Sequence, residues 1–270
     1  MAVSPNLLQA FAIVNTMQPA ERGMLRAIIT YGKDLPQEAG RLVESDFQLA
    51  TFGNKVSGAT VARYLYAAFK EGVGFADRLK GYPRSYGKQL DLIIKKTILK
   101  PLKLKKPNFK EKANTLAGAY ERERFVTESL MDNLIKTMDN ATQKEFAKNI
   151  DDFLKHKGVD TDLAGQVSAA LIQGGLVAAR TIMGASFGLL LVRVAGLINA
   201  MLFGKTLTVA AAAGLSRFAG IFFGPIGLGI TAILTIPIIT TLFNKRNYDK
   251  YLPAIFLIGL ARLAKEGEFE

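Results

Sequence analysis

Apolar residues recur at helical spacing through the first 160 residues of the chain. Ser4-Pro5 has the residue types of a helix start, a hydroxyl cap followed by a proline in the first turn. The apolar positions are Leu7, Leu8, Phe11 and Val14, then Met24, Leu25, Ile28 and Ile29, and then Val56, Val61, Leu65, Ala68 and Phe69. Repeats of three and four residues predict amphipathic helices that pack together in a bundle.

Lysines accompany the next predicted helix, between residues 85 and 106. Its apolar face contains Leu90, Ile93, Ile94, Thr97 and Ile98, and Pro101 ends or kinks it. Leucine and lysine then alternate over 102–105, a pattern that suits an anionic lipid surface because lysine tips meet phosphates while the apolar face inserts. We expect a membrane-docking site made of Lys95, Lys96, Lys100, Lys103, Lys105 and Lys106. The alternative is a solvated, lysine-rich face of a bundle helix.

Two further helices are expected between residues 115 and 157. The first has Phe125, Leu130, Leu134 and Met138 at helical spacing, and the second has Phe146, Ile150, Phe153 and Leu154. Thr142 is the expected cap of the second helix, with Glu145 completing a capping box. The only histidine, His156, is expected in the last turn of this helix, closed by Gly158, where a cation faces the negative end of the helix dipole.

The composition changes abruptly at residues 160–163. From Leu163 to Phe243 there is no acidic residue, and the only charged residues are Arg180, Arg193, Lys205 and Arg217. Segments 182–203 and 218–243 each reach the roughly 20 apolar residues that span a bilayer. We therefore predict an all-α, multi-helix bundle with a long apolar, glycine-rich helical hairpin in its C-terminal half. Its expected divisions are an amphipathic, basic region at 1–162 and an apolar, membrane-active region at 163–270.

The apolar half contains features that define a candidate membrane-inserting site. Small residues recur four apart, a spacing that lets helices approach closely in lipid, while a central arginine and two prolines interrupt the apolar segments. The candidate residues are Gly184, Gly188, Arg193, Gly220, Gly224, Pro225, Gly227, Ile233 and Pro237. One alternative is a hairpin that stays buried and never meets lipid. Another is a hairpin buried by the N-terminal helices that emerges at a membrane, as in pore-forming colicin domains, an analogy at the level of fold only.

The net charge and the residue types present limit which catalytic, metal-binding and nucleic-acid-binding sites the chain could contain. The net charge is +12, and residues 80–112 hold eleven Lys and Arg against Asp91 and Glu111. The chain has no cysteine, and its single histidine lacks the partners of a triad or zinc site. A phosphate-binding loop ending at Lys205-Thr206 fails because Asn199 stands where the first glycine is needed. We expect no catalytic residues, metal or cofactor, and no nucleic-acid partner, because aromatic residues do not interleave the lysines.

Short motifs along residues 48–263 resemble the YaaW family of bacterial proteins, which is grouped with the ubiquinol–cytochrome c chaperone superfamily. The matching pieces are Phe52-Gly53 with Val61-Ala62, Tyr86 with the helix ending in Leu102-Lys103-Leu104-Lys105, Met138-Asp139 with Gln143-Lys144-Glu145-Phe146, Gly224-Pro225-Ile226-Gly227, and Tyr251-Leu252-Pro253-Ala254-Ile255 with Leu260-Ala261-Arg262. The first 45 residues do not match. The resemblance implies a helical fold and a membrane-linked or assembly role, and it carries over no catalytic residues.

Together these patterns predict a membrane-active helical protein of bacterial type, a pore-forming or membrane-permeabilising toxin or effector. Its expected partners are an anionic lipid membrane, further copies of itself within the membrane, and a neutralising protein. The alternative is a membrane-associated assembly chaperone that binds apolar segments of client proteins. The first residues lack the basic start and apolar core of a secretory signal, so we expect synthesis in the cytoplasm and membrane association in the active form.

Overall fold

The computed structural model of the chain describes residues 3–31, 51, 53–95, 118–184, 187, 190, 194 and 251–268. Every regular element within these ranges is a helix, which confirms the all-α fold class for them. Contacts divide the described residues into two compact units. Unit 1 contains residues 3–127 and 251–259, and unit 2 contains residues 128–194 and 260–268.

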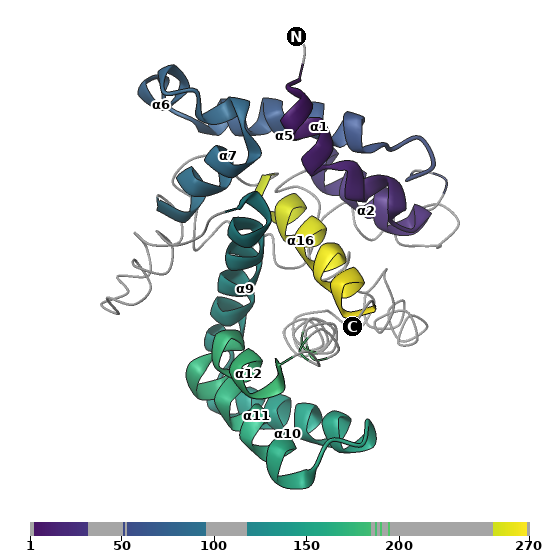
Figure 1. Cartoon of the computed structure of the whole chain (residues 1–270), viewed down its shortest axis with the longest axis vertical. Coiled ribbons are helices and arrows are strands. Elements are labelled where there is room, and N and C mark those ends of the chain that lie inside the picture. Colours follow the sequence, from purple (N-terminus) through teal and green to yellow (C-terminus); the bar gives the residue numbers. More distant parts are fainter. Residues whose placement is uncertain are drawn as a thin grey trace. The chain divides into compact units, whose positions relative to one another are not determined.

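Unit 1 consists of helices of different lengths (Figure 1), and it buries several aromatic side chains. Its elements are α1 (Pro5–Ala10), the 3-10 helix η1 (Ala12–Thr16), α2 (Pro19–Tyr31), α5 (Gly58–Gly72), α6 (Phe75–Leu79), the 3-10 helix η3 (Tyr82–Arg84), α7 (Tyr86–Ile93), and the first parts of α9 (Ala119–Thr137) and α16 (Tyr251–Glu268). The Phe11 ring packs edge-on against Tyr86, and Phe69 packs against Tyr251, each pair with centroids 5.0 Å apart.

The start of the chain folds largely as its pattern predicts. Ser4 caps α1, its hydroxyl accepting a hydrogen bond from the Leu7 N–H. Leu7, Phe11 and Val14 are buried. Leu8, which belongs to the same apolar pattern, is 38% exposed. Adjacent helical residues point about 100° apart, and only one of two neighbouring leucines can face the core.

Close backbone approach fixes how α5 begins. A Cβ on Gly58 would collide with the Phe11 carbonyl oxygen, so only glycine lets the start of α5 lie against the end of α1. The Asn15 Oδ1 accepts a hydrogen bond from the Gly58 N–H at 2.8 Å. The apolar face of α5 is then buried as predicted, including Val61 and Leu65 at 0% exposure.

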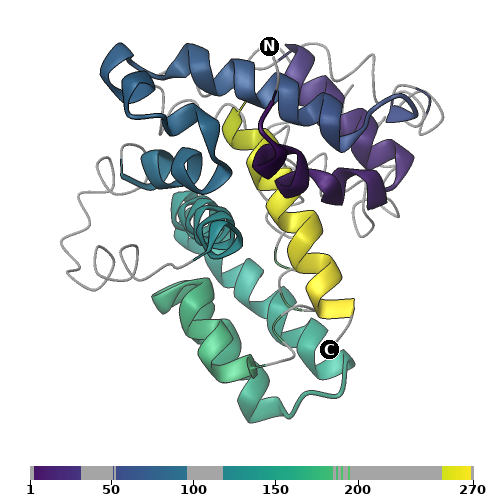
Figure 2. The ribbon, with the colours of Figure 1, turned by 45° about the horizontal axis from the view of Figure 1, so that its top comes forward.

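Buried hydrogen bonds tie α9 and α16 to α7 within unit 1. The Tyr251 hydroxyl donates to Gln89 Oε1 at 2.6 Å, and the Tyr86 hydroxyl donates to Glu123 Oε2. Figures 1 and 2 both place the start of α16, in yellow, beside α7 and α9. Each of these long-range bonds joins polar groups that are buried, where hydrogen bonding is the rule.

Unit 2 contains the second part of α9, α10 (Asn140–His156), α11 (Thr161–Gly174) and α12 (Leu176–Met183), which are teal to green in Figure 2, together with the second part of α16. Of the predicted stripe, Phe146, Ile150 and Leu154 are buried at 1% exposure or less, whereas Phe153 is only half-buried. α10 ends at His156 and is followed by Gly158 at φ +82°, which confirms the predicted helix end.

The predicted start of α10 is wrong. Asp139, not Thr142, is its cap, and Asp139 Oδ1 accepts a hydrogen bond from the Thr142 N–H at 2.7 Å. A carboxylate here satisfies an otherwise unpaired N–H and favours the positive end of the helix dipole. The helix therefore begins at Asn140, and the Thr142 side chain is buried within the first turn.

The predicted apolar hairpin lies mostly outside the described residues and stays a prediction. Among the helices that the structure describes, none combines the length and apolar character needed to cross a bilayer. The two units are defined by contacts between residues, whereas the predicted division at residue 162 rests on composition. That division therefore stays a prediction. The described start of the apolar half, α11 and α12, packs in unit 2 through Val167, Leu171 and Leu176.

Candidate membrane-docking site

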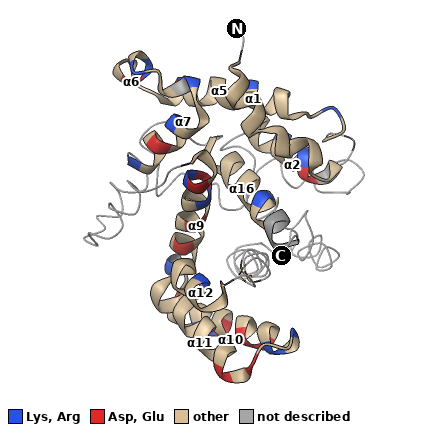
Figure 3. Ribbon diagram, viewed as in Figure 1, with Lys and Arg blue, Asp and Glu red and all other residues tan. Residues whose placement is uncertain are grey.

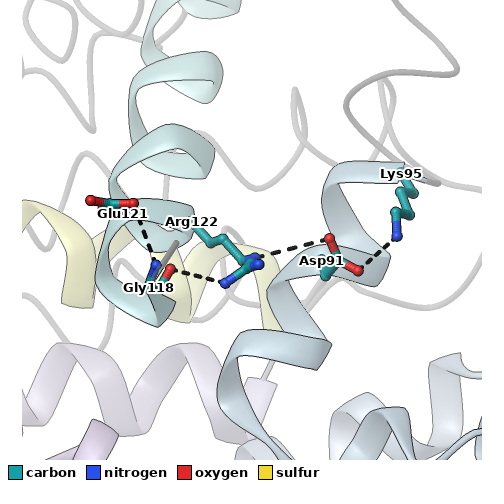
Figure 4. Close-up of polar contacts among 5 residues, drawn as sticks. All are labelled: Asp91, Lys95, Gly118, Glu121 and Arg122. Carbon is teal, nitrogen blue, oxygen red and sulfur yellow. Dashed lines mark hydrogen bonds and ion pairs between the residues drawn. The ribbon is translucent and has the colours of Figure 1, made fainter. Parts of the chain in front are cut away.

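Lys95 is the one residue of the predicted docking site that lies within the described ranges. It follows α7, and its ammonium is 2.8 Å from Asp91 Oδ2, one helical turn earlier (Figure 4). The hydrogen bond that Lys95 donates to Asp91 raises the pKa of Lys95, against a smaller opposing effect of burial. The lysine side chain is 52% exposed, so its charge faces solvent while one carboxylate partly neutralises it.

Asp91 also forms a contact across the lysine-rich segment 96–117, between α7 and α9. Its Oδ1 lies 3.9 Å from Arg122 Nε on α9, and Arg122 Nη1 donates to the Gly118 carbonyl at 3.2 Å. The Gly118 N–H in turn donates to Glu121 Oε2 at 3.4 Å (Figure 4). Lys95 directly follows α7 and its C-cap, Gly118 directly precedes α9, and the two residues flank residues 96–117. These contacts therefore link the residues on the two sides of that segment.

The remaining predicted docking residues lie outside the described ranges. They are Lys96, Lys100, Lys103, Lys105 and Lys106. Of the predicted membrane-inserting residues, only Gly184 is described. It ends α12 with φ +56°, a backbone conformation that glycine adopts without strain. The others, Gly188, Arg193, Gly220, Gly224, Pro225, Gly227, Ile233 and Pro237, are outside the described ranges.

Carboxylates of α9 hold the first helices of the apolar half within unit 2. Glu128 forms an ion pair with Arg180 of α12, and the Arg180 guanidinium also lies 4.8 Å from the centre of the Phe187 ring. Asp132 Oδ1 accepts a hydrogen bond from the Leu176 N–H, the first residue of α12, at 2.7 Å. The sequence prediction missed both carboxylates, since their partners lie 52 and 44 residues away along the chain.

Asp132 is electrostatically unusual. Burial raises its pKa from 3.8 to about 6, although the Leu176 hydrogen bond and the charge of Lys136 oppose the shift. A Cβ on Gly175 would lie 2.6 Å from Asp132 Oδ2, and Gly175 has φ +77°. Glycine at this position therefore lets the α11–α12 junction close onto the carboxyl group.

Exposed apolar side chains of α6 are a second feature that the sequence prediction missed. Phe75 is 77% exposed and Leu79 is 73% exposed, and both lie on a helix of five residues. Basic residues of α6 and α7 are blue in Figure 3. The signal in the sequence was an apolar pair four residues apart between Gly74 and Gly81, within the basic part of the chain.

Within the described residues, no group of three or more histidine, aspartate or glutamate side chains is arranged to hold a metal ion. Comparison with known proteins gives no match to a family model, a curated protein or a solved structure. The resemblance to the YaaW family therefore stays a prediction.

Proposed function

We propose that this chain is a membrane-active helical protein that permeabilises anionic bilayers, as a pore-forming or permeabilising bacterial effector. The observation that carries the proposal is the stretch from Leu163 to Phe243, which has no acidic residue and four basic ones. Water-soluble proteins rarely use so many consecutive residues in helices that are apolar all round. The segments within it are long enough for a bilayer of ordinary thickness.

Two contacts of the described residues support a folded form that holds the start of this stretch. Arg180 and the N-terminus of α12 are paired with Glu128 and Asp132 of α9. Both carboxylates are buried, with Glu128 4% exposed and Asp132 9% exposed. Breaking one such pair removes an ion pair or hydrogen bond from a buried carboxylate, which costs about 1–3 kcal/mol or more. A chain of this kind would be stable away from membranes and would reorganise upon binding lipid.

Dye release from anionic liposomes tests the proposal directly. We expect the wild-type chain to release an entrapped dye from vesicles that contain phosphatidylglycerol. A chain that releases no dye but holds a soluble apolar client peptide would contradict the proposal and favour the assembly chaperone.

The docking step is tested by replacing the six lysines of the docking site, Lys95, Lys96, Lys100, Lys103, Lys105 and Lys106, with glutamine. Each basic residue near an anionic surface is worth about 1 kcal/mol, and salt screens the attraction. We expect this variant to bind anionic vesicles much more weakly than the wild-type chain does. Unchanged, salt-independent binding would rule out a docking role for these lysines.

The insertion step is tested by Ile233→Asp. A carboxylate in the middle of a bilayer costs on the order of 3 kcal/mol, so we expect dye release to fall sharply. Circular dichroism of the variant in water identifies a change that acts through unfolding instead. If the variant stays folded and releases dye at the wild-type rate, residues 226–243 are not the inserting segment. Lipid-phase photolabelling of the wild-type segment provides an independent measurement, and an unlabelled segment would contradict insertion.

A further inference from the structure

Helix α6 presents two large apolar side chains to solvent. Phe75 and Leu79 are four residues apart, which places them on one side of the helix, and about three quarters of each side chain is exposed. Asp77 lies on the opposite side and is buried. Figures 1 and 2 both place α6 at the outer end of α5. Most apolar residues of similar size in unit 1 are buried, so this pair is a candidate contact surface.

A side-chain hydrogen bond and a glycine turn hold α6 in this position. Arg78 Nε donates a hydrogen bond to the Val73 carbonyl at 3.0 Å, which fastens the helix to the end of α5. Gly81 has φ +71° and turns the chain directly after α6. The two apolar side chains therefore project from an anchored turn.

Every exposed charge from residue 74 to residue 84 is positive. Arg78, Lys80 and Arg84 are exposed, whereas the single acidic residue of this range, Asp77, is buried. An apolar tip whose exposed charged neighbours between residues 74 and 84 are all cations complements an anionic bilayer, since the cations reach phosphates while the apolar side chains enter the boundary between headgroups and acyl chains. The charges thus favour lipid over a hydrophobic protein groove.

The size of the tip also favours a lipid surface. An aromatic side chain supplies about 150–250 Å² of surface, so the exposed pair offers on the order of 300 Å². A stable protein interface needs about 800 Å² from each partner. A shallow membrane anchor has no such minimum, because its apolar part penetrates only about 5–10 Å.

We propose that α6, through Phe75 and Leu79 with Arg78, Lys80 and Arg84, is a docking site for an anionic bilayer, separate from the lysines that begin at Lys95. This inference deepens the proposed function and rests on it in one respect, that the target is an anionic membrane. It does not require that the apolar half inserts.

Because the chain has no tryptophan, Phe75→Trp places a single fluorophore at the tip. Tyr64→Trp is the matched control, since Tyr64 is a 56% exposed aromatic residue of α5 in the same unit. With vesicles of phosphatidylcholine and phosphatidylglycerol, we expect the emission of the Phe75→Trp chain to shift to the blue and to be quenched by brominated lipids. The emission of the Tyr64→Trp chain should change little.

The double variant Phe75→Ser with Leu79→Ser measures the contribution of the tip to binding. Both side chains are mostly exposed, so the fold should persist, and circular dichroism checks this. We expect at least a tenfold loss of partitioning to anionic vesicles by cosedimentation, corresponding to about 1.4 kcal/mol. Replacing Lys80 and Arg84 with glutamine, which leaves the hydrogen bond from Arg78 to Val73 in place, should reduce the salt dependence of binding.

Three outcomes would overturn the inference, and they separate it from the proposed function. If the wild-type chain binds vesicles and releases dye while the Phe75→Trp emission and the partitioning of the double variant are unchanged, the docking site is refuted and the proposed function stands. If the wild-type chain binds no vesicle of any composition, both are refuted. A blue shift that follows protein concentration without lipid would identify a second copy of the chain as the occupant, against lipid.

Discussion

Replacing Asp132 with asparagine should change how the stability of unit 2 depends on pH. The Asp132 side chain is buried, and its Oδ1 accepts the hydrogen bond of the Leu176 N–H at 2.7 Å. Asparagine keeps an acceptor oxygen at this position but removes the titratable group. The variant therefore isolates the free energy of carrying a charge at this site.

The direction follows from the raised pKa of Asp132, about 6 in the folded chain against 3.8 for an unperturbed aspartate. Between these values the folded state binds more protons than the unfolded state, so stability falls as the pH rises. The contribution of the protonated carboxyl group is fully present below pH 3.8 and is lost as the pH passes through about 6. A difference of about two pKa units corresponds to about 3 kcal/mol.

The quantity to compare is the difference in unfolding free energy between the asparagine variant and the wild-type chain. From pH 4 to pH 7.5, we expect this difference to change in favour of the asparagine variant by up to ~3 kcal/mol. Urea unfolding followed by circular dichroism at both pH values measures this. Any cost of placing the amide N–H groups is the same at both pH values and cancels. Asp152→Asn, at an exposed position of α10, is the control. If the difference between wild type and Asp132→Asn is independent of pH, the reasoning about burial is wrong.

Three further changes test the packing of the two units, each by urea unfolding. Tyr251→Phe removes the hydroxyl that donates to buried Gln89, and a loss of about 1–3 kcal/mol is expected; an unchanged midpoint would mean that water or another group replaces it. Asp139→Ala removes the cap that binds the Thr142 N–H and should cost about 0.5–2 kcal/mol, with recovery in Asp139→Asn. Phe146→Ala in the core of unit 2 should cost about 3–5 kcal/mol, and a loss below 1 kcal/mol would contradict its burial.

Local patterns in the sequence predicted helices and their buried faces well. The stripe of Phe146, Ile150 and Leu154 is buried because a period near 3.6 leaves one face of a helix for apolar side chains. The Ser4 cap was predicted because its hydrogen bond joins residues three apart. The cap of α10 was misplaced because Asp139 and Thr142 both have suitable side chains, and only the folded backbone decides between them.

Features set by contacts between distant residues could not be predicted. Glu123 and Glu128 lie on a helix whose other face is apolar, and charge alone suggests that they face solvent. Both are buried, because Tyr86 and Arg180, from other helices, bind them. The exposure of Phe75 could not be predicted either. An apolar residue is expected to be buried, and the sequence does not reveal which side of its helix the rest of the chain covers.

The described part of the apolar half limits how the proposed insertion can proceed. Residues 161–183 form α11 and α12, which carry Arg180 and a helix N-terminus bound to carboxylates of α9. Moving Arg180 into a bilayer would cost about 2.5–3.5 kcal/mol and would also break its ion pair with buried Glu128. Gly184, at φ +56°, ends α12 just before the apolar segment continues. An insertion that begins after Gly184 leaves these paired charges in place, whereas one that begins at Leu163 must first break them.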